Sequence, residues 1–254
     1  MVYKAFDLTG KSVLITGGNS GIGLGFAEAL AQAGATVCIW GTNSSKNEMA
    51  LKKIGGKAIA FQCDVGDEAQ VEQRFADTVA ALGPLHGCFA NAGVSGRANV
   101  KSFADMDTEE WKRVTRVNLD GAFYTLRAAA RHMVSHGKGG ALVGTASLAA
   151  ISGQPRGEHY AATKGGLISM IRALAVEFAR HGIRANAILP GWIETAMTEK
   201  ALNWDKFRDK VLPRVPARRW GKPEDFGAIA VYLVSDASSY HTGDTFLIDG
   251  GYSL

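Results

Sequence analysis

The sequence is poor in proline and cysteine, with six and three residues among 254, and its formal net charge is only +4. It has no apolar run long enough to cross a membrane, so we expect no membrane-spanning helix. The scarcity of proline and the lack of a Gly-X-Y period exclude collagen-like and proline-rich chains. The mild charge, together with 46% hydrophobic residues, excludes a disordered chain.

The three cysteines, Cys38, Cys63 and Cys88, form no CxxC pair, and their number is odd. Their spacing suits neither a zinc site nor a disulfide framework, so we predict no metal and expect buried thiols in a reducing compartment. No apolar signal-peptide region follows the N-terminus, which favours a cytoplasmic protein. The densest basic patch, at 214–222, is interrupted by Pro216 and Trp220. It predicts a solvated loop, with anion contact as the alternative, rather than a nucleic-acid surface.

Glycine is abundant, at 31 residues. A compact fold uses glycine at tight turns and at close approaches of the backbone. The rest of the sequence alternates short apolar, β-branched runs with longer helical patterns. Strands are predicted at 12–16, 36–40, 57–63, 85–90, 141–145, 183–189 and 245–248. Helices are predicted at about 21–32, 46–54, 68–82, 108–136, 158–181 and 223–233, with two short helices before 212.

Continuous apolar strands joined by helices predict a parallel sheet that is covered on both faces. No linker, repeat or change of composition divides the chain. We therefore expect one α/β domain over 1–254, a Rossmann-type doubly wound sheet of about seven strands. The ligand of such a sheet lies beyond the carboxyl ends of its strands.

A glycine cluster, TGGNSGIG at 16–23, joins the first strand to the first helix. Gly17 permits the turn, Gly21 lacks the side chain that would block a pyrophosphate, and Gly23 lets helix and strand pack closely. The helix N-terminus supplies free N–H groups and a positive dipole end. This context predicts a dinucleotide site, and a glycine-rich turn without a ligand is the alternative.

Tyr160 and Lys164 are four residues apart near the start of a predicted helix, so they lie on one face within reach of each other. The phenol has an ordinary pKa near 10, and a neighbouring ammonium stabilises the phenolate and lowers that pKa. Ser147 follows a strand, where its hydroxyl can orient a reacting oxygen. Singly, a Tyr-x-x-x-Lys pair is common by chance, and a serine after a strand is ordinary turn chemistry.

In combination and order, these features resemble the short-chain dehydrogenase/reductase family, whose cofactor motif is TGxxxGxG. Further matches extend over nearly the whole chain: CDV at 63–65, NAG at 91–93, PGWIET at 190–195 and DGG at 249–251. The resemblance implies an NAD(P)-dependent oxidoreductase that transfers a hydride between a nicotinamide and a secondary alcohol or ketone.

The resemblance also implies a catalytic tetrad. Tyr160 would be the general acid/base, Lys164 its activator and ribose anchor, and Ser147 the group that orients the substrate oxygen. Asn118 would hold a water that connects Lys164 to solvent. The alternative for Asn118 is a polar helix residue bonded to nearby backbone.

The family's cofactor motifs imply contacts along much of the chain, with Asp64 at the adenine and with Ile193 and Thr195 at the carboxamide. The expected cofactor residues are Gly17, Asn19, Ser20, Gly21, Ile22, Gly23, Thr42, Asn43, Asp64, Val65, Asn91, Ala92, Gly93, Tyr160, Lys164, Pro190, Gly191, Ile193 and Thr195.

The sequence departs from the family pattern at the end of the second strand. NAD-preferring members have an Asp there and NADP-preferring members an Arg just after, whereas this chain has GTNSSK at 41–46. No carboxylate is present to repel a 2′-phosphate, although the customary arginine is also missing. Residues that can contact the phosphate are Thr42, Asn43, Ser44 and Lys46. We therefore favour NADP and keep NAD open.

We expect Val94, Gly96 and Arg97 to form one wall of the substrate site. Leu148, Ala149, Gln154 and His159 are candidates for the others. The segment at 192–212 fits a lid, with ordinary packing of its aromatic residues as the alternative. The resemblance further implies a homotetramer through the helices at 108–136 and 158–181.

Two alternative functions remain. One keeps the chemistry and changes the substrate, as a reductase of 3-oxoacyl thioesters on an acyl carrier protein. The other is a non-catalytic, nucleotide-sensing Rossmann protein, against which the complete tetrad argues.

Overall fold

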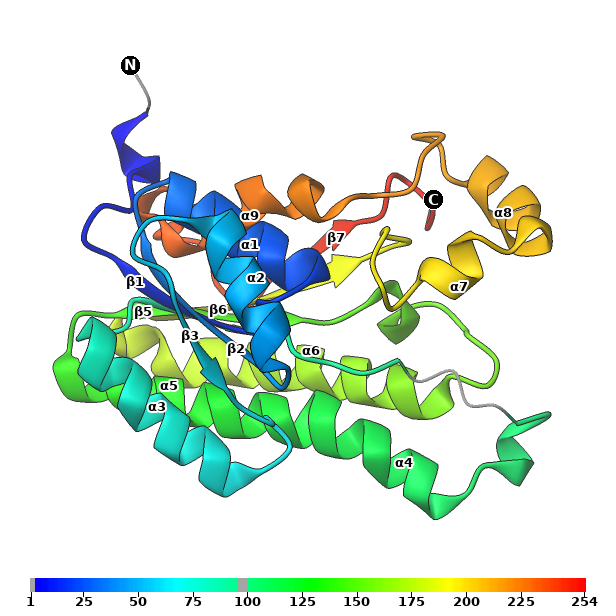
Figure 1. Ribbon diagram of the computed structural model, residues 1–254, viewed down its shortest axis with the longest axis horizontal. Helices are drawn as coiled ribbons and strands as arrows, with labels where there is room; N and C mark the ends of the chain where they lie inside the picture. The colour runs from blue at the N-terminus through cyan, green and yellow to red at the C-terminus, as the bar shows by residue number, and fades with distance from the viewer. Residues whose placement is uncertain (1–2, 96–99) are drawn as a thin grey trace.

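The computed structural model describes residues 3–95 and 100–254. Seven strands form one sheet in the order β3-β2-β1-β4-β5-β6-β7, and every neighbouring pair is parallel (Figure 1). The strands are β1 (Ser12–Thr16), β2 (Thr36–Gly41), β3 (Ile59–Gln62), β4 (Gly87–Ala90), β5 (Gly140–Thr145), β6 (Ile183–Pro190) and β7 (Thr245–Ile248). The predicted doubly wound sheet is confirmed.

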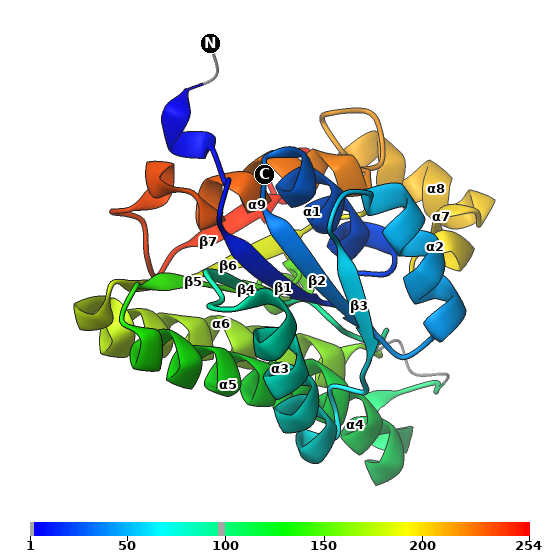
Figure 2. The same cartoon turned by 60° about the vertical axis from the view of Figure 1, so that its left-hand side comes forward.

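Helices cover both faces of the sheet (Figure 2). One face carries α1 (Gly21–Gln32), α2 (Ser44–Ile54) and α9 (Gly227–Val234). The other carries α3 (Glu68–Leu82), α4 (Thr108–Thr115), α5 (Gly121–His136) and α6 (Glu158–Phe178). Two short helices, α7 (Glu199–Leu202) and α8 (Asp205–Val211), lie at the end toward which β6 and β7 point. Among the described residues, no helix has the length and apolar character that a membrane crossing requires.

The central strands are buried on both faces because their side chains alternate between two cores. Leu14 of β1 packs in the core beneath α3, α5 and α6, whereas its neighbours Val13 and Ile15 pack in the core beneath α1 and α9. Cys38 and Cys88 belong to the first core, and all three cysteines are free and buried. This alternation explains the continuous apolar runs of the strands.

The helix expected at 108–136 differs from the prediction in its middle. Between α4 and α5 the chain forms a π-helical segment, Arg116–Asp120, which contains Asn118. A π turn takes one residue more than an α turn and changes the direction of the side chains that follow. The other differences are confined to ends of elements. For example, α2 begins at Ser44 rather than near Lys46, because Asn43 caps it.

The strand order places the ligand site. β1 pairs with β2 on one side and with β4 on the other, so the connections that leave the carboxyl ends of β1 and β4 diverge to opposite faces. Such a point of divergence leaves a crevice beyond the ends of the strands. The glycine turn after β1 lies at this crevice.

Candidate active site

A cavity of about 450 Å³ opens beyond the carboxyl ends of β1, β4, β5 and β6. All the expected cofactor residues line it except Asn43. Of the expected tetrad, Ser147, Tyr160 and Lys164 line it and Asn118 does not. One cavity therefore joins the glycine turn to the Tyr-Lys pair, although these features are far apart in the sequence.

The glycine turn has the shape of a phosphate cradle. Gly17 and Gly21 have φ values of +64° and +52°, in the left-handed region that side chains disfavour. A Cβ on Gly21 would lie 3.1 Å from Cγ2 of Thr195, across the mouth of the cavity. Ser20 makes no side-chain bond to the N-terminus of α1, which leaves the first N–H groups of that helix available. The turn therefore fits a pyrophosphate.

Hydrogen bonds fix the floor of the crevice between β1 and β4. The Thr16 hydroxyl accepts the N–H groups of Asn91 and Ala92, each at 3.0 Å, and donates to the Phe89 carbonyl at 3.2 Å. The Asn91 amide donates to the Thr16 carbonyl at 2.9 Å. The NAG segment is thus held directly beside the glycine turn.

At the end of β2, two asparagines occupy the space over Gly41. Asn47 is buried and donates to the carbonyls of Gly41 and Phe61 at 3.1 and 3.3 Å, so its amide oxygen faces Asn19, which donates to it at 2.7 Å. A Cβ on Gly41 would overlap the Asn19 side chain. The packing therefore excludes any side chain at position 41, and with it a carboxylate at this position.

Asn43 is the one expected cofactor residue that does not line the cavity. Its side-chain oxygen accepts the Lys46 N–H at 2.9 Å and caps α2, so the side chain is turned toward its own helix rather than into the cavity. Asn caps a helix by satisfying a free N–H of the first turn. Thr42, next to it, does line the cavity.

Several lining residues were not expected from the sequence, and Arg116 and Thr198 are the two whose polar contacts shape the site. The Arg116 guanidinium forms an ion pair with Asp64, with Nη1 and Oδ2 2.9 Å apart. The Thr198 hydroxyl donates to the Ile193 carbonyl and accepts the Thr195 N–H at 3.1 Å. The three-residue spacing of Thr195 and Thr198 was a usable signal, whereas nothing in the sequence links Arg116 to Asp64.

Lys164 is buried with its amine aimed at the end of β5. Nζ donates to the Thr145 carbonyl at 2.7 Å and lies 5.6 Å from the centre of the Tyr160 ring. Burial lowers the pKa of Lys164 to about 8. The predicted Tyr-Lys pair therefore exists, and its amine is still mostly protonated at neutral pH but titrates not far above it.

In the protein without a bound cofactor, the pKa of Tyr160 is shifted in the direction opposite to the expected lowering. Burial raises the pKa of Tyr160, and a hydrogen bond with Ser147 acts in the opposite direction. The Ser147 oxygen also accepts the Ala149 N–H at 3.1 Å, which fixes the side chain. A desolvated phenol favours its neutral form because its charge is costly inside the protein.

Asn118 lies behind the cavity wall and bonds to the segment after β4. Its Oδ1 accepts the Val94 N–H at 2.8 Å, and its Nδ2 donates to the Val94 carbonyl at 3.1 Å. The side chain is thus used in backbone bonding, as the alternative interpretation held, but on a different segment. A Cβ at Gly93 would lie 3.2 Å from Asn118 Oδ1 and 3.5 Å from Lys164 Nζ, so both polar groups lie close to Gly93 on the side where a side chain would stand.

Only part of the expected substrate region lines the cavity. Val94 and Met197 line the cavity, whereas Gly96 and Arg97 lie outside the described residues. Leu148, Ala149, Gln154 and His159 are not among the lining residues. Trp192 packs edge-on against Phe207, with ring centroids 4.8 Å apart. The aromatic residues of the 192–212 segment therefore also pack with one another.

Known proteins resemble this chain over nearly its full length. A family model described as enoyl-(acyl carrier protein) reductase matches residues 17–253. An L-rhamnose 1-dehydrogenase (NAD(P)(+)) of Azotobacter vinelandii is 36% identical over 251 residues, which are 96% of this chain and 97% of the relative.

Two solved structures have nearly the same fold. A short-chain type dehydrogenase/reductase from Mycobacterium marinum has a TM-score of 0.92 at 37% identity, covering 99% of this chain and 98% of its own. A gluconate 5-dehydrogenase from Burkholderia cenocepacia, in complex with NADP and tartrate, has a TM-score of 0.92 at 34% identity, covering 98% of each. These matches show that the chain belongs to the short-chain dehydrogenase/reductase family and is an NAD(P)-dependent oxidoreductase acting on alcohol and ketone groups.

Proposed function

We propose that Tyr160 exchanges the proton at the substrate oxygen while Ser147 orients that oxygen. The bound nicotinamide supplies or accepts the hydride at the adjacent carbon. In reduction, the Tyr160 hydroxyl gives its proton to the carbonyl oxygen, and in oxidation the phenolate takes the proton from the alcohol. The observation that carries this proposal is the convergence of Ser147, Tyr160 and Lys164 on the cavity that holds the phosphate cradle.

Lys164 has two roles in this proposal. Its amine anchors the cofactor's ribose, and its positive form stabilises the phenolate. We also propose that a water beside Gly93 links Lys164 to Asn118 and returns the proton that Tyr160 gives up. Asn118 Oδ1 and Lys164 Nζ both lie near Gly93 and offer two of the polar partners that a buried water needs.

The test of the chemistry is Tyr160→Phe. We expect kcat to fall about 100-fold or more, because the general acid/base is lost. The dissociation constant for NADPH, followed by nicotinamide fluorescence, should change little. Full activity of Tyr160→Phe would overturn the mechanism. A wild-type protein that binds cofactor but converts nothing across a broad panel would favour the nucleotide-sensing alternative.

The preferred cofactor is NADP in our proposal. The end of β2 holds no carboxylate, and the packing of Asn19 and Asn47 over Gly41 leaves no room for one. The gluconate 5-dehydrogenase relative was solved with NADP. Values of kcat/KM with the two cofactors test this, and a tenfold or larger preference for NAD would overturn it.

We propose a polyhydroxylated, sugar-type secondary alcohol as the substrate. The relatives act on L-rhamnose and gluconate, according to their names. The description of the matching family model favours a second candidate, a thioester of an acyl carrier protein. A panel of aldoses, aldonates, cyclic ketones and acetoacetyl thioesters distinguishes the two, because only the second candidate predicts a preference for the thioester.

The assembly and the cellular setting are further proposals. We propose a homotetramer in which α4–α5 and α6 pair across two-fold axes, because Trp111, Phe123 and Val176 expose apolar surface on these helices.

The segment at 192–212, within a single domain of 1–254, is proposed as a substrate lid, since Met197 lines the cavity and remains half exposed. Three free, buried thiols fit a reducing cytoplasm.

A further inference from the structure

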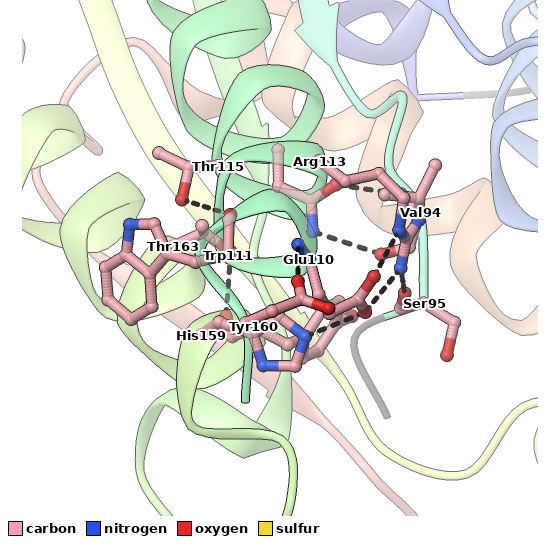
Figure 3. A network of polar contacts seen from close by, with 11 residues as sticks. Val94, Ser95, Glu110, Trp111, Arg113, Thr115, His159, Tyr160 and Thr163 are labelled. Carbon is pink, nitrogen blue, oxygen red and sulfur yellow. Dashed lines mark hydrogen bonds and ion pairs between the residues drawn. The ribbon is translucent and has the colours of Figure 1, made fainter. Parts of the chain in front are cut away.

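A network of charged groups connects the helix of Tyr160 to the segment after β4 (Figure 3). Arg113 of α4 makes a two-bond fork with the Glu110 carboxylate, at 2.7 and 2.8 Å. The same guanidinium donates to the Ser95 carbonyl at 2.9 Å. His159, directly before Tyr160, places Nε2 3.2 Å from Glu110 Oε1. The network thus spans three segments that surround the substrate end of the cavity.

The protonation states within the network follow from its chemistry. The bonds from Arg113, helped by the bond from His159, lower the pKa of Glu110 to about 2, so the carboxylate is charged. A carboxylate only accepts, so Nε2 of His159 carries the hydrogen. The ring is fully buried, and its Nδ1 has no partner in the described part of the chain. A buried imidazole held by one polar bond depends on that bond for its orientation.

The far end of the network meets the cavity wall. Val94, which lines the cavity, is bonded through both its N–H and its carbonyl to Asn118, and Ser95 follows it. The Arg113–Ser95 bond therefore adds a third anchor to the same short stretch of backbone. One side of the substrate site is tied to α4 and, through Glu110 and His159, to the turn of α6 that presents Tyr160.

We propose that Glu110, together with Arg113 and His159, is a positioning residue that holds the Val94–Ser95 wall at a fixed place relative to Tyr160. None of the three lines the cavity, so they act on the reaction through the segments that they join. A bidentate Arg–carboxylate pair is directional and keeps its geometry better than a single bond. Small displacements of a positioning group cost rate and binding because reacting atoms need near-contact geometry.

α4 also carries a matched control. Glu109 and Lys112 form an ion pair of the same i,i+3 spacing, at 3.1 Å, on the exposed side of the helix. Neither side chain forms a hydrogen bond or ion pair with α6 or with the described residues after β4. Glu109→Gln therefore removes the same charge from the same helix without touching the wall.

The kinetic test rests on the proposed function and compares Glu110→Gln with Glu109→Gln. We expect Glu110→Gln to raise the KM of the alcohol or ketone substrate about fivefold, with the KM of the dinucleotide unchanged within twofold. Glu109→Gln should leave both constants at their wild-type values. Within the network, His159→Gln keeps an N–H donor for Glu110 and should retain near wild-type kinetics. His159→Leu removes that donor and should resemble Glu110→Gln.

A second readout needs no turnover. Hydrogen exchange of the Val94 amide in the cofactor-free protein should be about tenfold faster in Glu110→Gln than in Glu109→Gln, because the wall opens more often. If Glu110→Gln folds poorly, Arg113→Lys takes its place in the test. It keeps the positive charge but loses the two-bond fork, and it should show the same acceleration of Val94 exchange. The positioning role is overturned if the wild type is active and the two glutamine variants show equal Val94 exchange and equal substrate KM. A wild type inactive toward every substrate contradicts the proposed function, and the exchange data still decide the inference.

Discussion

Lys164 illustrates, at the scale of the residue, how the burial of an ionisable group costs stability. Its amine is fully buried, with one hydrogen bond to the Thr145 carbonyl, and burial lowers its pKa to about 8. A base with a depressed pKa binds fewer protons in the folded than in the unfolded state. Stability therefore rises with pH between the folded pKa and the unfolded value near 10.4, and it is lost again on acidification.

We expect this dependence to disappear in Lys164→Met, which has similar volume and no titrating group. From pH 7.5 to 9.5, the free energy of unfolding of the wild type should gain about 2 kcal/mol relative to Lys164→Met. Urea unfolding at both pH values measures it. The three buried thiols titrate equally in both proteins and cancel from the difference. The exposed control, Lys112→Met, should behave as wild type. The depressed pKa would be contradicted if the difference in free energy of unfolding between the wild type and Lys164→Met were the same at both pH values.

The residue scale also shows where sequence reasoning reaches its limit. Gly17, Asp64 and Thr195 could be placed in the site because fixed motifs carry them at the ends of strands. Asn43 and Asn47 are the same residue type near the same strand end, yet one caps α2 and the other holds Asn19 over Gly41. Only the tertiary positions of the Phe61 carbonyl and Asn19 determine that division. The Glu110–His159 contact likewise joins residues 49 positions apart, which no local pattern predicts.

At the scale of elements, histidines hold the amino ends of β1 and β4 against α5. His86 Nδ1 accepts the Ser12 N–H at 3.1 Å, and His132 Nε2 accepts the Leu85 N–H at 3.1 Å. A third ring, His136, lies 4.9 Å from His132 and accepts the Lys138 N–H through Nδ1. Nδ1 of His86 and Nε2 of His132 must be unprotonated to accept, so acid breaks these two bonds between elements.

Burial, followed by neighbouring positive charges, lowers the pKa of both His86 and His132. Because the folded pKa values lie below the unfolded value near 6.5, stability is lost as the pH falls through that value toward the folded pKa values. We expect the Tm to decrease by a few degrees between pH 7.5 and pH 5.5. His132→Gln keeps an acceptor for the Leu85 N–H without titrating, so its Tm should decrease less. Equal decreases in the two proteins would exclude His132 as a source.

The elements themselves were largely predictable, because each strand is a short apolar run and each long helix has an amphipathic pattern. The π-helical segment at Arg116–Asp120 was not, since neither composition nor periodicity marks the insertion of one residue into a helix. It lies where Asn118 must reach across to Val94, a tertiary requirement. Helical propensity predicts that a helix exists there and leaves its local register open.

At the scale of the whole molecule, the strand order brings together residues that the sequence separates. Tyr160 and Lys164 on α6, the glycine turn after β1 and the wall after β4 share one cavity because β4 lies beside β1. The alternation of strands and helices predicts a doubly wound sheet, and the motif order predicts which ends carry the site. Neither pattern predicts the contacts between subunits. Those contacts must be argued from the exposed surface of the molecule.

The surface that we assign to the homotetramer includes Val176 of α6, whose residue surface is 84% exposed. In the proposed tetramer a partner helix covers this side chain, and a carboxylate in its place would be desolvated there without a counter-charge. Wild-type protein should sediment at about four times the 26.9 kDa of the chain, and Val176→Asp as smaller species with the same far-UV circular dichroism. Met49→Asp, on the exposed side of α2, should remain tetrameric. A monomeric wild type would refute the assembly, and a tetrameric Val176→Asp would remove α6 at Val176 from the interface.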